Sequence, residues 1–245
     1  MPSYVVVGAS RGIGLGFLKN LAANPDNTVI GIARNPSAVE SVPNVTLLQG
    51  DLTDAASLKA AASKVATITK DGAVDHLIVN GAYLSYDTEF ITPRGFVDKE
   101  DYFLSEFQKA MHTNVAGVLF AVNAFVPLLK KSAIKKVVAL SSGLGVPDLL
   151  VSSNFSTAIP YTTSKAALHI LIAELAVEYK EEGIKFLSLS PGVVSTRPDP
   201  STLYPNWTGP FSVEESVEHQ LKVIEGLTLE NSGAYLSHWG NKEWL

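Results

Sequence analysis

The chain has 245 residues, of which 46% are apolar and 18% charged, so we expect one large domain with a sizeable buried core. The formal net charge of −5 gives no reason to expect a nucleic-acid partner, and the absence of cysteine excludes disulfides, thiolate catalysis and cysteine-ligated metals. We recognise no signal peptide and no uninterrupted apolar run of the roughly 20 residues that a bilayer span needs. We therefore expect a cytoplasmic protein without a membrane partner.

Short β-branched runs alternate with longer helical patterns along the chain. The runs are continuously apolar rather than alternating, as expected for strands that helices cover on both faces. They lie at 4–7, 28–33, 45–49, 74–80, 135–141, 184–190 and 233–237. Helical patterns lie near 12–23, 54–70, 100–130, 160–181 and 212–227. This order predicts an α/β fold of the Rossmann type: a single domain over 1–245 with a doubly wound parallel sheet of about seven strands and helices on both faces.

Two segments interrupt this alternation, and both follow the carboxyl ends of strands, where ligands bind in open α/β sheets. The first is an insertion loop at 143–159. The second, at 195–211, contains four prolines together with Tyr204, Trp207 and Phe211. Long loops in compact domains are often functional, so we interpret 195–211 as a substrate loop. A plain surface loop is the alternative.

The first predicted strand runs directly into GASRGIG, residues 8–14, and then into a helix. Glycine permits a tight turn and a close approach of backbone amides to a ligand, and a helix N-terminus suits a diphosphate. A structural turn that binds nothing is the alternative. The stretch Gly8–Gly12 also matches the GxSxG pattern of a hydrolase nucleophile, but that elbow belongs in the middle of a sheet rather than after its first strand.

Two arginines refine the predicted cofactor. Arg11 lies within the glycine-rich turn, and Arg34 lies just past the second strand. In dinucleotide-binding folds an acidic residue at the second position bonds the ribose of NAD, whereas arginine accommodates the extra phosphate of NADP. The sequence therefore favours NADP(H) over NAD(H).

Tyr161 and Lys165 stand at the start of an otherwise apolar helical pattern. Residues four apart lie on the same face of a helix, so the two side chains can meet. A neighbouring ammonium favours the ionised form of a phenol and lowers its pKa. The pair is thus a candidate acid/base device, with an ordinary surface pair as the alternative.

With GASRGIG after its first strand and YTTSK in its second half, the chain resembles the short-chain dehydrogenases/reductases of the compact single-domain type, and among them the carbonyl reductases. The resemblance implies hydride transfer between a nicotinamide and a carbonyl carbon. Tyr161 would supply the proton, while Lys165 would lower the pKa of the phenol and bind the nicotinamide ribose. Ser142, preferred over Ser141 as the second serine of the pair, would hold the carbonyl oxygen. Asn114 would anchor a water that leads protons to Lys165.

Further motifs extend this resemblance along the chain. Asp51 in QGDLTD corresponds to the family residue beside the adenine, and PGVVST (191–196) matches the family's PGxVxT. Asn80 stands where the family has NNAG, although Val79 replaces the first asparagine and Gly81-Ala82 inverts the last two residues. The cofactor-binding residues implied are Gly8, Ser10, Arg11, Gly12, Ile13, Gly14, Arg34, Asp51, Leu52, Asn80, Gly81, Tyr161, Lys165, Pro191, Gly192, Val194 and Thr196.

Two observations concern metals and assembly. None of the five histidines pairs with another at metal-ligand spacing, so no metal site is expected. The pattern from Ala166 to Val177 is apolar on nearly all sides, which indicates burial beyond the sheet side. In the family this helix and the one near 112–130 pack against a second subunit. The resemblance therefore implies a homodimer or homotetramer, with a monomer as the alternative.

These observations lead to one functional hypothesis: NADPH-dependent reduction of a ketone or aldehyde, with an apolar or aromatic compound as substrate. A dehydrogenase that oxidises alcohols with NADP⁺ is the first alternative. A non-catalytic NADP(H)-binding regulator is the second, although such a protein has no physical need for Tyr161 and Lys165 together.

Overall fold

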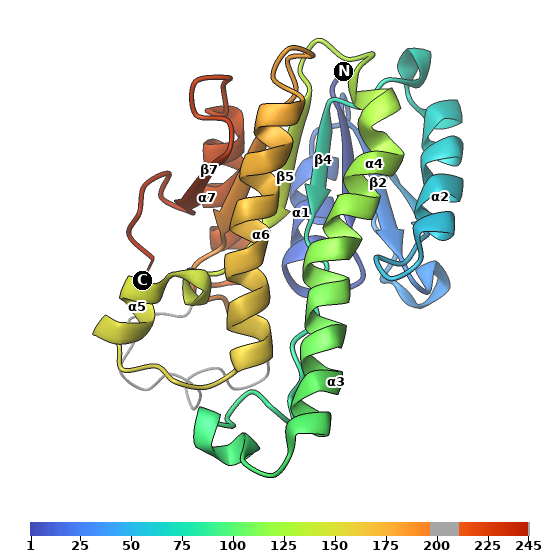
Figure 1. The fold of residues 1–245 in the computed structure, drawn as a ribbon. Helices are drawn as coiled ribbons and strands as arrows, with labels where there is room; N and C mark the ends of the chain where they lie inside the picture. The colour runs from blue at the N-terminus through green and yellow to red at the C-terminus, as the bar shows by residue number, and fades with distance from the viewer. Residues whose placement is uncertain (197–210, 245) are drawn as a thin grey trace.

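The computed structural model describes residues 1–196 and 211–244, and they form a sheet covered by helices on both faces (Figure 1). All seven strands are parallel and follow the order β3-β2-β1-β4-β5-β6-β7. Their bounds are β1 (Ser3–Val7), β2 (Thr28–Ala33), β3 (Val45–Gln49), β4 (His76–Val79), β5 (Lys136–Leu140), β6 (Lys185–Ser190) and β7 (Ala234–Ser237). The predicted Rossmann-type fold is confirmed.

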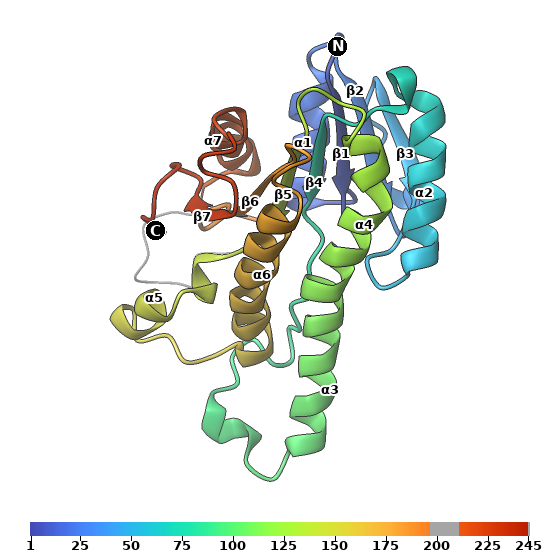
Figure 2. The same cartoon turned by 45° about the horizontal axis from the view of Figure 1, so that its top comes forward.

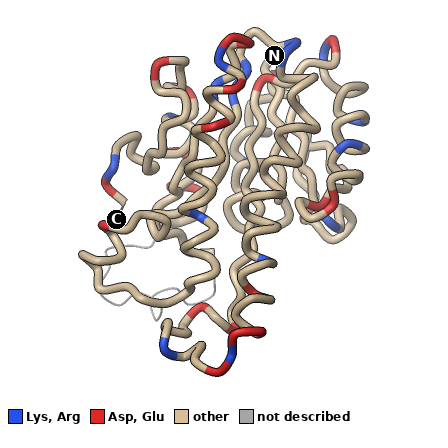
Figure 3. The backbone as a smooth tube through the Cα atoms, viewed as in Figure 1, with Lys and Arg blue, Asp and Glu red and all other residues tan. Residues whose placement is uncertain are grey.

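The helices divide between the two faces of the sheet (Figure 2). On one face lie α1 (Gly12–Ala22) and α7 (Val213–Glu225). On the other lie α2 (Ala55–Ile68), α4 (Gly117–Leu129) and α6 (Ile159–Glu178). Few charged residues lie along α4 and α6, which cover the centre of the sheet (Figure 3).

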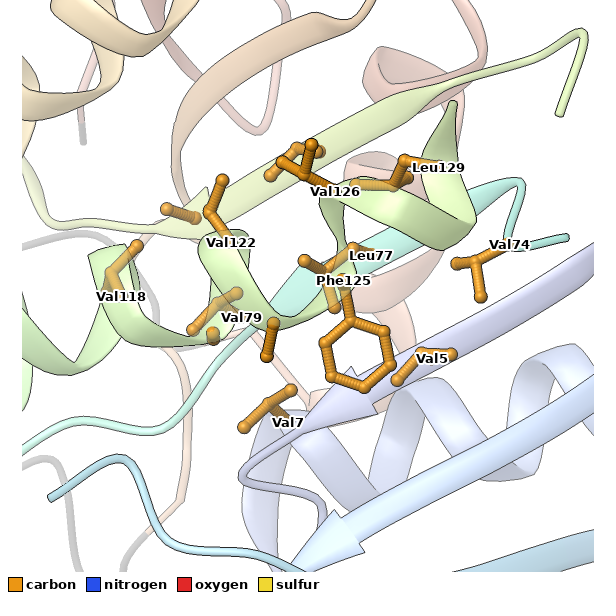
Figure 4. Close-up of a cluster of buried hydrophobic side chains, with 14 of the residues drawn as sticks. Val5, Val7, Val74, Leu77, Val79, Val118, Val122, Phe125, Val126 and Leu129 are labelled. Carbon is orange, nitrogen blue, oxygen red and sulfur yellow. The ribbon is translucent and has the colours of Figure 1, made fainter. Parts of the chain in front are cut away.

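The larger core cluster lies between the sheet and the α2–α4–α6 layer. Phe125 of α4 is fully buried over the side chains of Val5, Val7, Leu77 and Val79 from β1 and β4 (Figure 4). Burial of one such aromatic side chain contributes roughly 1.5–3 kcal/mol to stability. Because β1 and β4 are neighbours at the centre of the sheet, this packing fixes the edge where their carboxyl ends meet.

The helical pattern predicted near 100–130 is interrupted at its centre. It consists of α3 (Glu100–Met111), a π-helical turn over His112–Ala116, and α4. By length and composition the helix Glu100–Leu129 could cross a membrane, but 56% of its most apolar window is buried inside the protein. Its apolarity is therefore accounted for by its place in the core. The π turn carries Asn114, and such turns are frequent at functional sites.

The insertion loop 143–159 contains two short elements, a 3₁₀ turn at Gly143–Gly145 and α5 (Pro147–Ser152). Ala158 ends it in a left-handed conformation, with φ at 55°, directly before α6. Of the predicted substrate loop 195–211, the described residues pair at its base, because Ser195 N donates to Phe211 O over 2.9 Å. The rest, with Tyr204 and Trp207, lies outside the described residues.

Candidate active site

A cleft of about 380 Å³ opens at the carboxyl ends of β1, β2 and β4, where the strand order reverses. Open α/β sheets bind their ligands at this kind of switch point. The predicted cofactor residues that line the cleft are Gly8, Ser10, Arg11, Gly12, Ile13, Arg34, Asp51, Leu52, Asn80, Gly81 and Thr196. The lining residues that were not among the predicted cofactor residues are Val7, Ile32, Ala33, Gly50, Thr53, Ala82, Tyr83, Tyr86 and Thr113. Thr53 and Ala82 stand within motifs already recognised, and Tyr83 and Thr113 lie close in sequence to Asn80 and Asn114.

The glycine-rich turn brings β1 against β4 without intervening side chains. Gly8 has φ at +83°, and a Cβ there would lie 2.4 Å from the Cα of Gly81. The Nδ2 of Asn80 donates to the carbonyl oxygen of Gly8 over 2.8 Å. Gly14 does not line the cleft. A Cβ on it would lie 2.2 Å from that same oxygen, so its role in the structure is to pack α1 against the turn.

The turn and the start of α1 suit a diphosphate. Within the described part of the chain no side chain caps the N-terminus of α1, and no acidic residue lies in its first turn. The amides there are thus available to an anion, and the helix dipole favours negative charge. Arg11 and Arg34 are exposed at the rim of the cleft. Asp51 is engaged locally, since its Oδ1 accepts bonds from the backbone N and hydroxyl of Thr53, both at 2.9 Å.

Tyr161 and Lys165 meet on α6 as the spacing predicts. The Nζ of Lys165 lies 5.5 Å from the centroid of the Tyr161 ring. Lys165 is 2% exposed, and its amine donates to the carbonyl oxygen of Leu140 at the end of β5 over 2.7 Å. Burial lowers the pKa of Lys165 from 10.5 to about 7, because the charged amine loses its water. The amine therefore changes protonation near neutral pH.

Asn114 ties three segments of the site together. It is fully buried, and its Oδ1 accepts from the backbone N of Tyr83 over 2.6 Å. Its Nδ2 donates to the carbonyl oxygen of Tyr83 and to the hydroxyl of Ser164, both at 2.9 Å. Ser164 in turn donates to the carbonyl oxygen of Tyr161 over 2.7 Å. The amide thus fixes the π turn, the segment after β4 and the first turn of α6 relative to one another.

The side chain of Tyr83 is held as firmly as its backbone. Its hydroxyl donates to Glu106 of α3 over 2.9 Å, and Glu106, 4% exposed, forms an ion pair with Lys109 over 2.7 Å. Burial opposes the ionisation of Glu106, but the bonds it accepts outweigh burial and lower its pKa. The segment after β4 is therefore anchored to α3.

The two serines after β5 have different surroundings. Ser141 is 4% exposed, and its Oγ shares a hydrogen bond of 2.7 Å with the Nε2 of His169. Ser142 is half-buried, and its Oγ accepts from the backbone N of Leu144 over 3.2 Å. That bond leaves the hydroxyl hydrogen of Ser142 available to a further acceptor.

The PGVVST turn leads from β6 towards the glycine-rich turn. The carbonyl oxygen of Pro191 accepts from Ser216 of α7 over 2.7 Å, and Val194 pairs with Phe211. Gly192, with φ at +80°, lies against the ring of His238. Thr196 reaches the turn itself, where a Cβ on Gly12 would lie 3.3 Å from its Cγ2. Of these residues only Thr196 lines the cleft.

Fold and site together define a dinucleotide-binding oxidoreductase, and comparison with known proteins specifies its family. The model of the short chain dehydrogenases matches residues 3–202. The chain is 41% identical to the short-chain dehydrogenase/reductase AacuF of Aspergillus aculeatus and 35% identical to iacC of Pestalotiopsis fici, over the whole of each chain. The solved structure of an NADPH-bound carbonyl reductase from chicken fatty liver is 30% identical, with a TM-score of 0.84 over 98% of this chain and 93% of that one.

The chain therefore belongs to the short-chain dehydrogenase/reductase family and is carbonyl reductase-like. The expectation from GASRGIG and YTTSK is confirmed at the level of family and fold.

Proposed function

We propose that this oxidoreductase reduces a ketone or an aldehyde with NADPH, and that Tyr161 donates the proton. The observation that carries the proposal is the position of the buried amine of Lys165, 5.5 Å from the centroid of the Tyr161 ring. A buried amine beside a phenol is costly for stability, because burial opposes its charge. A role in acid/base catalysis would explain why the chain keeps the buried amine of Lys165 beside the phenol of Tyr161.

Bound NADPH would supply the hydride. As a carbonyl group is reduced, negative charge grows on its oxygen, and a proton donor must already be in place there. In this proposal Tyr161 gives that proton, and the protonated amine of Lys165 stabilises the phenolate that remains. Ser142 donates its free hydroxyl hydrogen to the same oxygen. Asn114 keeps the first turn of α6 in register with the cleft through Ser164.

The cleft residues also support the preference for NADP(H). Backbone amides at the start of α1 would hold the diphosphate, and Arg11 and Arg34 would pair with the additional phosphate on the adenine-side ribose. The chicken carbonyl reductase, which the chain resembles over nearly its full length, is an NADPH-bound structure. We propose an apolar or aromatic carbonyl compound as substrate, since Tyr83 and Tyr86 are among the residues that line the cleft.

The decisive experiment follows NADPH absorbance against a panel of ketones and aldehydes, with wild type, Tyr161→Phe and Tyr179→Phe. The second variant is a matched control, because Tyr179 lies at the other end of α6 with Lys130 Nζ 5.6 Å from its ring centroid. We expect Tyr161→Phe to lower kcat by about 10²–10⁴-fold, the usual contribution of a positioned acid, and Tyr179→Phe to leave it unchanged.

The two alternatives predict other outcomes of the same experiment. Faster reduction of NADP⁺ by alcohols than oxidation of NADPH by any carbonyl at pH 7 would favour the oxidative direction. NADPH binding without consumption, and without any difference between the two tyrosine variants, would favour a regulator.

A further inference from the structure

A third polar residue continues the line of Tyr161 and Lys165 along α6. His169 lies one turn beyond Lys165, and its ring stacks on Tyr235 of β7 with centroids 3.7 Å apart and planes 21° from parallel. Tyr235 in turn stacks on Trp244, with centroids 4.2 Å apart and planes 10° from parallel. We call His169, Tyr235 and Trp244 the aromatic column. It links the catalytic helix to the segment that follows the last strand.

The aromatic column contacts the turn that carries Ser142 at three alternate residues. The Nε2 of His169 shares a hydrogen bond of 2.7 Å with the Oγ of Ser141. A Cβ on Gly143 would lie 2.9 Å from the Cβ of Trp244, and a Cβ on Gly145 would lie 2.8 Å from the Cε1 of His169. The aromatic column therefore contacts residues 141, 143 and 145, with Ser142 between the first two.

A neutral imidazole can accept this bond from the Ser141 hydroxyl or donate to its oxygen, according to its tautomer. Burial, and then the charge of Lys165, lowers the pKa of His169 to about 4, so the ring is neutral at physiological pH. Lys165 and Tyr235 are the titratable groups that face it from α6 and β7. His169 thus acts through its hydrogen bond and its packing and exchanges no proton with the substrate.

We propose that the aromatic column positions Ser142 to receive the carbonyl oxygen, so that residues of β7 and the following segment set the rate of a reaction they do not touch. The inference rests on the proposed reductase function. Its members are positioning residues: they fix the turn, and Ser142 makes the contact. A shift of the serine hydroxyl by about 1 Å is enough to lower the rate by about a hundredfold.

The first test compares His169→Leu with His169→Gln in the NADPH assay. Leucine removes the bond to Ser141, whereas glutamine can restore it with a side-chain amide near the position of Nε2. We expect His169→Leu to lower kcat by about ten- to a hundredfold, with an unchanged KM for NADPH, and His169→Gln to recover most of the loss. Trp244→Ala should lower kcat in the same direction but less.

The control is Ser188→Ala. Ser188 is a buried serine on β6 whose hydroxyl has no hydrogen-bond partner among the residues that the structure describes. Its loss should therefore leave kcat unchanged, whereas Ser141→Ala should lower it. A His169→Leu variant with wild-type kcat, or a glutamine variant no better than the leucine variant, would overturn the proposal.

A second measurement does not depend on turnover. Hydrogen exchange in the cofactor-free protein reports whether residues 141–146 are held by the aromatic column. We expect exchange in a peptide over 141–146 to become roughly fivefold faster in His169→Leu, the effect of one lost hydrogen bond, with exchange over 8–14 unchanged. If exchange over 141–146 does not change, the column does not hold the turn. If the wild type reduces no carbonyl compound, the proposed function fails separately.

Discussion

The carboxyl edge of the sheet has two halves that are built differently. The half at β1–β3 forms the cleft from glycines and backbone amides, with Arg11 and Arg34 exposed at its rim. The half at β4–β6 places polar side chains in the interior: Asn114, Ser141 and Lys165 are 0%, 4% and 2% exposed. Backbone amides and arginines can bind a charged cofactor, and they stay hydrated until it binds. Proton transfer instead uses a buried group, because burial lowers the pKa of the Lys165 amine to about 7.

Replacing Lys165 should impair the half of the edge at β4–β6 and largely preserve the half at β1–β3. Lys165→Met removes the cation that stabilises the phenolate of Tyr161, so we expect kcat to fall by about 10²–10⁴-fold. Because the glycine-rich turn and both arginines stay intact, NADPH should still bind, and fluorescence titration measures this. Loss of NADPH binding to the same extent as kcat would show that the two halves are not separable.

Gly14→Ala should disrupt the half of the edge at β1–β3. The added Cβ would lie 2.2 Å from the carbonyl oxygen of Gly8 and 2.7 Å from the Nδ2 of Asn80. We expect a loss of roughly 1–3 kcal/mol in the free energy of unfolding, measured by urea denaturation, with weaker NADPH binding. The control is Gly226→Ala, where the nearest atom to a Cβ is 3.6 Å away and φ is −75°. Equal stability of the two variants would contradict the structure of the turn.

Arg34→Glu should change the cofactor preference and leave the half of the edge at β4–β6 intact. The carboxylate would repel the extra phosphate of NADPH and could bond ribose hydroxyls. We expect the ratio of kcat/KM for NADPH to that for NADH to fall by roughly tenfold or more, equivalent to about 1.4 kcal/mol, with little change in kcat. An unchanged ratio would place the phosphate contact elsewhere, with Arg11→Glu as the next variant.

The last prediction concerns the dependence of stability on pH. As pH rises, folded Lys165 loses its proton at about pH 7, whereas an unfolded lysine keeps it to about 10.5. Between these values the unfolded state binds more protons, so the contribution of Lys165 to stability rises with pH. The cost of its burial is therefore greatest below pH 7. The Tm of Lys165→Met relative to wild type should be higher at pH 6 than at pH 9, measured without cofactor.

The exposed Lys59 of α2 provides the comparison, because Lys59→Met should show no such trend. A Tm difference for Lys165→Met that stays constant or grows with pH would contradict the lowered pKa.

The sequence predicted the elements whose signal is local. Each strand is a short continuous apolar run, and Tyr161 and Lys165 meet because they are one helical turn apart. Contacts between distant segments were not predictable. Nothing near Asn114 indicates that its amide binds the backbone of Tyr83, 31 residues away, and His169 reaches Ser141 across 28 residues.

Irregular backbone was also missed. The π turn over His112–Ala116 interrupts a pattern that reads as one continuous helix. The short helix α5 (Pro147–Ser152) lies in what reads as a loop, because six residues carry too little periodicity to be recognised. Both features adjoin the candidate site, where tertiary contacts override local preference.

The contact between Gly8 and Gly81 has a practical consequence for protein engineering. The turn after β1 and the turn after β4 touch backbone to backbone, at a distance that admits no side chain on Gly8. A chimaera that joins the first 70 or so residues of this chain to the remainder of a relative would need a small residue at both positions at once. Libraries of such chimaeras should therefore first be selected for small residues at positions 8 and 81, before any other property is screened.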